Sequence, residues 1–254
     1  MKIKHFVTIT TLCFLLSCKQ QEKVSLTQIK AQQEAIDSTI VANKRIDSFI
    51  NPFKNHLNKE LDTPLANASS NLTKTDGELV SSLGNLMADI CLTQANPIFE
   101  KRENKNIDFV LLNYGGIRAP IPKGNITARN AFEVMPFENE LVVVELSGVK
   151  TEELLTYLAT EKKAHPIANM SLKIIKEENQ YSEVIINGNS FDETKNYFVL
   201  TSDYLQQGGD NMKFFSNPIK IYKTEYKLRN ALIDYFKKAD TIVPNLEKRI
   251  EYAG

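Results

Sequence analysis

Residues 111–139 read LLNYGGIRAPIPKGNITARNAFEVMPFEN, and together with residues 197–215, YFVLTSDYLQQGGDNMKFF, they decide the fold. Each stretch starts as an apolar run typical of a buried strand and continues into a Gly-Gly turn. The first turn carries Arg118 and the second carries Asp210. Adjacent glycines permit positive φ and close backbone approach, so such turns often line ligand sites. We therefore expect the two turns to converge in the fold. Their glycines are Gly115, Gly116, Gly208 and Gly209.

Together the two stretches closely resemble the C-terminal domain of the 5'-nucleotidase family, which recognises the nucleoside part of the substrate. The resemblance covers roughly residues 62–250, down to Leu246-Glu247-Lys248-Arg249-Ile250, which is similar to the family's closing Glu-Gly-Arg-Ile. It implies an α+β fold, a layered α/β/β/α domain with mixed sheets. The order of apolar runs favours the same class, because strands and helices interleave without a βαβ rhythm.

The resemblance assigns binding roles to five side chains. Phe137 and Tyr204 match the two aromatic residues that sandwich the base, and such stacking contributes about 1–3 kcal/mol per base. Asn113 matches the asparagine that contacts the base, and Asp210 matches the carboxylate that accepts from ribose hydroxyls. Arg118 matches the arginine that approaches the phosphate, a geometry that suits a guanidinium fork. The alternatives are two core aromatics, a turn aspartate that bonds its own backbone, and a surface arginine.

The sequence departs from the family at three places. A basic residue that helps to hold phosphate in several members precedes Leu-Gly-Asn, whereas here Ser81 and Ser82 precede Leu83-Gly84-Asn85. We therefore expect weak phosphate binding by this chain alone. Tyr114 replaces a small residue, and Glu138 stands where glycine or asparagine is usual. The preferred base and the form of the phosphate stay open.

Catalytic machinery for phosphate-ester hydrolysis is not expected in this chain. The reaction needs metals that activate water or an activated nucleophile. The family carries its metal ligands in Asp-x-His and Gly-Asn-His-Asp motifs of a preceding domain, and neither string occurs here. The two histidines beyond the leader, His56 and His165, are expected at the surface. We predict no catalytic residue, no metal site and no cofactor in this chain, with divalent metal ions only on a partner catalytic chain.

The amino terminus resembles a bacterial lipoprotein leader. Lys2 and Lys4 precede an apolar run over residues 6–16, which is too short for a permanent membrane span. The run ends in Leu15-Leu16-Ser17-Cys18, which looks like a lipobox. We expect a signal peptide over residues 1–17 and lipidation at Cys18. The alternative is an ordinary signal peptide with a chance cysteine.

Beyond the leader the sequence predicts two parts. Residues 18–60 are expected to form the anchor, a polar tether and a helix that packs on the domain, and residues 61–254 form the domain itself. Within the domain, Leu83, Leu86, Met87 and Ile90 have the spacing of a buried helix face. Residues 197–201 read as a strand, and Asn187-Gly188 as a tight turn. A last helix is indicated by Leu228, Ala231, Leu232, Tyr235 and Phe236.

Charge and cysteine content narrow the function classes. The chain has 31 basic and 31 acidic residues, and losing Lys2 and Lys4 with the leader would leave a formal charge of −2. Nucleic-acid binding would need a clustered excess of Lys and Arg, so no nucleic-acid partner is expected. Beyond Cys18 only Cys91 remains, and its apolar helical surroundings predict a buried small hydrophobe.

The preferred hypothesis is a lipid-anchored substrate-recognition domain of a split hydrolase in nucleotide catabolism. A separate metallophosphoesterase chain would supply the metals, and this chain alone would be inactive. The first alternative is a surface lipoprotein that binds nucleosides or nucleotides without hydrolysis, and the second is a structural lipoprotein whose pocket has decayed. In each case we expect the bacterial cell envelope, on the periplasmic or the surface side. The leaflet and the oligomeric state stay open.

Overall fold

A computed structural model describes residues 25–253, and the chain divides into two compact units between Phe49 and Ile50 in the sequence. The predicted leader and Cys18 lie outside the described residues. In the described part of the chain, no helix has both the length and the apolar character that crossing a membrane requires.

A helix, α2 (Lys44–Leu61), precedes the domain, as the sequence predicted. None of its residues is buried, and Leu57 is 54% exposed. The contacts at its carboxyl end are polar: Arg129 donates to the Asn58 carboxamide at 2.9 Å and to the Asp62 carboxylate at 3.1 Å. The packing of this helix on the domain stays a prediction. Helical spacing of apolar residues predicts a helix, but it does not identify what covers the apolar face.

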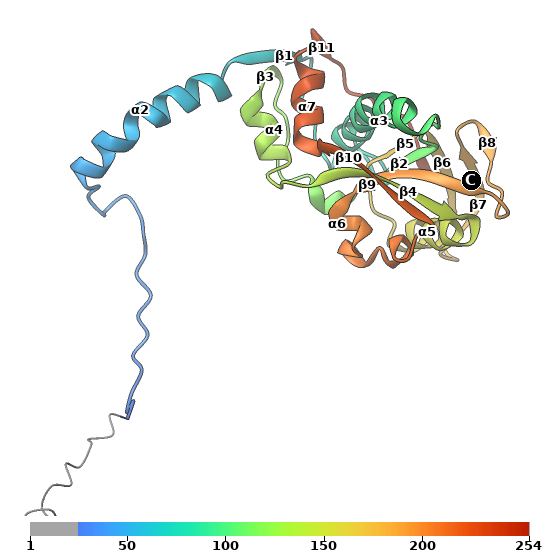
Figure 1. The fold of residues 1–254 in the computed structure, drawn as a ribbon, viewed down its shortest axis with the longest axis horizontal. Helices are drawn as coiled ribbons and strands as arrows, with labels where there is room; N and C mark the ends of the chain where they lie inside the picture. The colour runs from blue at the N-terminus through green and yellow to red at the C-terminus, as the bar shows by residue number, and fades with distance from the viewer. Residues whose placement is uncertain (1–24, 254) are drawn as a thin grey trace, which may run out of the picture. The chain divides into compact units, whose positions relative to one another are not determined.

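A five-stranded mixed sheet forms the centre of the second unit (Figure 1). Its central strands β9 and β2 run parallel, and the other neighbours pair antiparallel. The predicted strand over residues 197–201 is thereby confirmed. In spatial order the strands are β10 (Lys220–Lys227), β4 (Glu140–Ser147), β9 (Asn196–Ser202), β2 (Phe109–Leu111) and β5 (Ile167–Ala168).

Two smaller sheets are also mixed, which confirms the α+β class. In the four-stranded sheet, the turn at Asn187-Gly188 has φ values of 49° and 75°, as predicted for a tight hairpin. That sheet orders β12 (Ile250–Tyr252), β6 (Met170–Ile175), β7 (Gln180–Ile186) and β8 (Asn189–Ser190). The three-stranded sheet orders β11 (Thr241–Ile242), β1 (Pro64–Ala68) and β3 (Gly124–Thr127).

The central sheet is buried on both faces, because side chains alternate between two cores. Val110 faces a core that includes α3 (Ser82–Glu103) and α7 (Leu228–Phe236), whereas Phe109 and Leu111 face a core with α5 (Gly148–Glu161) and the four-stranded sheet. In Figure 1, α3 and α5 lie on opposite sides of the sheet. Cys91 of α3 is fully buried as predicted, and burial raises the pKa of its thiol.

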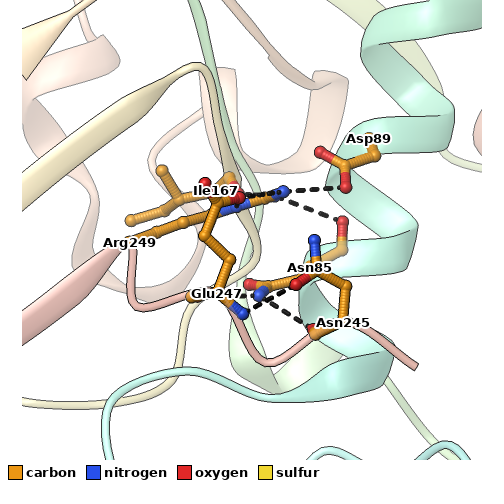
Figure 2. A network of polar contacts seen from close by, with 6 residues as sticks. All are labelled: Asn85, Asp89, Ile167, Asn245, Glu247 and Arg249. Atoms are coloured by element: carbon orange, nitrogen blue, oxygen red, sulfur yellow. Dashed lines mark hydrogen bonds and ion pairs between the residues drawn. The ribbon is translucent and has the colours of Figure 1, made fainter.

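The carboxyl-terminal segment is held on α3 by a buried arginine (Figure 2). Arg249 donates to the Ile167 carbonyl at 2.6 Å and to the Asp89 carboxylate at 2.8 Å, and it also contacts Glu247. One turn earlier on α3, the Asn85 amide donates to the carbonyls of Asn245 and Glu247 at 3.1 and 3.0 Å. The sequence that resembles the family's closing motif therefore connects α3, β5 and the last strand.

Candidate functional site

Several strand ends meet at one edge of the central sheet. Because β2 and β9 are parallel, their carboxyl ends lie at the same edge. Strand β4 is antiparallel to β9, with Leu141 opposite Ser202, so β4 begins where β9 ends. Strand β10 ends there too, since Lys227 lies opposite Glu140. The loops that leave this edge include both Gly-Gly turns and the Pro136-Phe137 corner, although they are far apart in sequence.

A cavity of about 270 Å³ opens at this edge. This volume is slightly below the range of roughly 300–1,000 Å³ for small-molecule pockets. The five side chains predicted to bind ligand all line it, as do both glycines of the first turn, whereas the glycines of the second turn do not. The lining residues are Asn113, Gly115, Gly116, Arg118, Met135, Phe137, Asn139, Ser202, Tyr204, Asp210 and Leu228.

Asp210 connects the two turns. Its carboxylate accepts hydrogen bonds from the Asn113 amide at 2.7 Å and the Tyr204 hydroxyl at 3.0 Å. The Tyr204 bond raises the pKa of that phenol, because it favours the protonated form. The Asp210 backbone is left-handed, with φ 52°, and the Tyr157 hydroxyl donates to its carbonyl at 3.1 Å. The carboxylate thus bonds side chains of the site, not its own backbone.

The glycines are needed because side chains of the site pack directly on the turns. A Cβ on Gly209 would lie 2.5 Å from the Tyr204 ring. A Cβ on Gly116 would lie 2.7 Å from the Asn113 carboxamide oxygen. Both distances are shorter than any tolerable contact, so a larger residue at either position would displace a pocket side chain.

Phe137 and Tyr204 are not core aromatics, since they are 41% and 47% exposed and line the pocket. The Arg118 guanidinium carbon lies 5.6 Å from the Phe137 ring centroid, within cation–π range. No acidic side chain within residues 25–253 forms an ion pair with Arg118. The pocket therefore combines two accessible rings, one carboxylate and one cation that is available to an anion.

His165 corrects a sequence expectation. It is only 5% exposed and lies behind the first turn, where its Nδ1 accepts the Tyr114 backbone N–H at 3.2 Å. Burial lowers the pKa of His165 to about 4, and the positive charge of the nearby Lys163 is the second cause. The surface prediction was wrong because the covering turn is 51 residues away in sequence. His56 is exposed as expected and lies 3.3 Å from Glu60.

Sequence reasoning missed other residues around the site. Lys74 donates to the Ile117 carbonyl at 2.8 Å and lies 4.4 Å from the Tyr114 ring centroid, so a cation does lie beside the first turn. Asn85, in contrast, holds the carboxyl-terminal segment and does not line the pocket. Asn139 also lines the pocket, and its place two residues after Phe137 in the sequence could have identified it. In the described range, residues 25–253, no three His, Cys, Asp or Glu side chains gather as a metal site would require.

Comparison with known proteins adds independent information. The family model described as "5'-nucleotidase, C-terminal domain" matches residues 60–217. Protein UshA of Escherichia coli is 24% identical over 232 residues, which are 90% of this chain and 40% of that protein. A 5'-nucleotidase of Vibrio parahaemolyticus is 24% identical over 85% of this chain and 38% of its own length. The chain thus spans about two-fifths of these relatives.

Solved structures agree on the fold. A 5'-nucleotidase precursor from Thermus thermophilus superposes with a TM-score of 0.68 at 22% identity, over 82% of this chain and 42% of that one. The NAD nucleotidase of Haemophilus influenzae gives 0.64 at 17% identity, over 83% and 41%. At these identities the likeness concerns the fold alone.

Proposed function

Because the chain belongs to the 5'-nucleotidase C-terminal domain family, we propose that it is the nucleotide-recognition part of a 5'-nucleotidase-type phosphoester hydrolase. The reaction serves nucleotide catabolism. A separate chain supplies the metallophosphoesterase half, with the divalent metal ions that activate water. This chain contributes binding and orientation of the nucleoside.

The observation that carries the proposal is the convergence of five side chains on one cavity. Asn113 and Arg118 come from one Gly-Gly stretch, Tyr204 and Asp210 come from the other, and Phe137 comes from the corner between α4 (Ala128–Val134) and β4. Aromatic faces, a carboxylate and a guanidinium are the groups that a base, a ribose and a phosphate require.

Asp210 retains the capacity to bind ribose while it holds the site together. A carboxylate offers about four acceptor positions on its two oxygens. Asn113 and Tyr204 use two of them. The remaining positions accept the ribose hydroxyls, and the base lies between the Phe137 and Tyr204 rings. Arg118, which lines the pocket beside Phe137, binds the phosphate.

The proposal is tested by phosphate release from AMP with Mn²⁺, Zn²⁺ or Mg²⁺. Residues 19–254 alone should show no turnover, and adding a metallophosphoesterase chain that lacks this domain should give hydrolysis that depends on both chains. Turnover by the purified chain alone would contradict the proposed split between substrate binding and catalysis. Hydrolysis by the partner at a rate that this chain does not change would contradict it too.

A second candidate is a binding lipoprotein without hydrolysis. It is favoured by one observation: two aromatic rings, a carboxylate and a guanidinium line one pocket of this domain. In this candidate, these groups bind the nucleoside without a catalytic partner. Tight binding with no hydrolysis in the presence of every metallophosphoesterase of the same cell would select this candidate.

Arg118→Ala is expected to weaken nucleotide binding more than nucleoside binding, because only a nucleotide presents a phosphate to the guanidinium. A charge-assisted hydrogen bond contributes about 1.5–3 kcal/mol, so AMP affinity should fall by roughly ten- to 150-fold. Adenosine affinity should change by less than about threefold. Calorimetric titration with both ligands measures the difference, and equal losses would remove Arg118 from the phosphate.

We also propose that the chain is held at the bacterial cell envelope by lipid on Cys18. One acyl chain holds a protein only marginally, so a stable anchor requires several acyl chains at this residue. Cys18→Ala should leave the membrane fraction or stay unprocessed. Fractionation and mass spectrometry measure both outcomes. A correctly processed Cys18→Ala chain that stays in the membrane fraction would exclude the anchor.

A further inference from the structure

We propose that Arg229 is a positioning residue for base binding, which fixes the segment 135–139 and thereby the Phe137 ring. The inference rests on the proposed function, because it takes Phe137 to be a ring on which the base stacks. Arg229 does not line the pocket. It acts through hydrogen bonds to the backbone carbonyls on both sides of Pro136.

One guanidinium contacts the segment at three residues. Arg229 is the second residue of α7 and is 7% exposed. Its Nη1 donates to the carbonyl of Phe137 at 3.2 Å and, more weakly, to that of Met135 at 3.4 Å. Its Nη2 pairs with the Glu138 carboxylate, and this bond lowers the pKa of Glu138. The guanidinium carbon also lies 4.1 Å from the Phe132 ring centroid, within cation–π range.

The local structure explains why an arginine is needed here. The segment 135–139 belongs to no helix or strand, so its carbonyls have no partners in regular structure. Pro136 contributes no N–H of its own. A planar guanidinium spreads five donors over three nitrogens in a fixed fork, so it can reach two carbonyls and a carboxylate at once, whereas the three donors of an ammonium all lie on one atom. A cation in the first turn of a helix is disfavoured by the helix dipole, so α7 itself gives no reason for this residue.

The neighbours of Arg229 hold only the far end of the segment. Lys227 donates from Nζ to the Glu138 carbonyl at 2.7 Å, and the Leu228 N–H donates to the Asn139 carbonyl at 3.0 Å. The Met135 and Phe137 carbonyls receive their hydrogen bonds from Arg229. Loss of the guanidinium therefore frees the part of the segment that carries the aromatic ring, while Asn139 stays attached.

The test is a double-mutant cycle on adenosine affinity, measured by calorimetric titration of residues 19–254. Arg229→Met should weaken binding by about three- to 30-fold, below the roughly 150-fold limit for complete loss of stacking. In a Phe137→Ala background the same change should alter affinity by less than about twofold, because no ring remains to be misplaced. Where Phe137 is present, Arg229→Lys should bind adenosine more tightly than Arg229→Met. In the Phe137→Ala background the two variants should bind equally.

A matched control separates positioning from general stability. Arg249 is also a buried arginine that binds backbone carbonyls and carboxylates, but none of its partners lines the pocket. Arg249→Met should lower the melting temperature without changing the affinity of the folded protein for adenosine. Glu138→Gln is a milder second variant, since the Glu138 side chain is 70% exposed. It should weaken binding about two- to fivefold, again only where Phe137 is present.

The outcomes are distinguishable. An unchanged affinity in Arg229→Met and Glu138→Gln, or equal losses with and without Phe137, would overturn the positioning role while leaving the pocket intact. If Arg229→Met does not fold, Glu138→Gln decides. A wild-type chain that binds no adenosine would overturn the proposed function and this inference with it.

Discussion

Arg249→Ala is expected to destabilise the protein by about 2–4 kcal/mol, mainly because it removes the charged donor from the buried Ile167 carbonyl, together with a weaker bond to the Asn85 carbonyl. The truncation also leaves a cavity between α3 and the last strand. Asp89 and Glu247 are 42% and 64% exposed, so water can solvate their charges and limits the cost. The shift in the urea midpoint at constant slope measures the loss of unfolding free energy.

Two comparisons identify the cause of this loss. Lys248→Ala removes an adjacent cation whose side chain is 75% exposed, and it should change stability by less than about 0.5 kcal/mol. Arg249→Lys keeps the charge but cannot serve both carbonyls and the carboxylates, so it should give an intermediate value. If Arg249→Ala were as stable as Lys248→Ala, the buried network of Figure 2 would contribute nothing to the fold.

Phe137→Ala and Tyr204→Ala are each expected to weaken nucleoside binding by about 1–3 kcal/mol, or roughly five- to 150-fold, through lost stacking. Both rings line the cavity and are about half exposed without ligand, so the ligand buries them. Calorimetric titration with adenosine measures each variant. The loss should appear equally for nucleosides and nucleotides, because the phosphate does not contact the rings.

Tyr204→Phe separates the ring from the hydroxyl. It keeps the stacking face and loses the hydrogen bond to Asp210, so we expect a loss of only a few-fold. Val243→Ala, a change at a 69% exposed apolar residue that does not line the pocket, should have no effect. Wild-type affinity in both alanine variants of the rings would show that the base binds elsewhere.

Local sequence signals predicted the elements of the fold well. The spacing of Leu83, Met87 and Ile90 reflects a helix face that is buried, and Asn187-Gly188 forms the expected turn. The pattern over residues 19–60 predicted a helix, and α2 is present. Its packing on the domain stays a prediction, because periodicity reports the conformation of a segment and not its tertiary partner.

The resemblance to the family predicted that the five candidate side chains would meet, and Arg118 and Asp210 each lie within two positions of a Gly-Gly turn. What the sequence could not supply were contacts between distant segments. His165 is buried by a turn around Tyr114, and Arg229 holds a corner more than 90 residues earlier. Arg229 follows Leu228 and shares a helix face with Leu232 and Phe236, and this position indicated a buried charge. Nothing in the sequence indicated Glu138 as its partner.

The most direct test of the binding pocket is a crystal structure of residues 19–254 grown with saturating AMP. The adenine should lie between Phe137 and Tyr204, with each ring about 3.5–4 Å from a face of the base. The ribose hydroxyls should bond the Asp210 carboxylate, and the phosphate should contact Arg118. An empty cavity at this edge of the central sheet, or AMP bound at another surface, would contradict the assignment of this chain to nucleotide recognition.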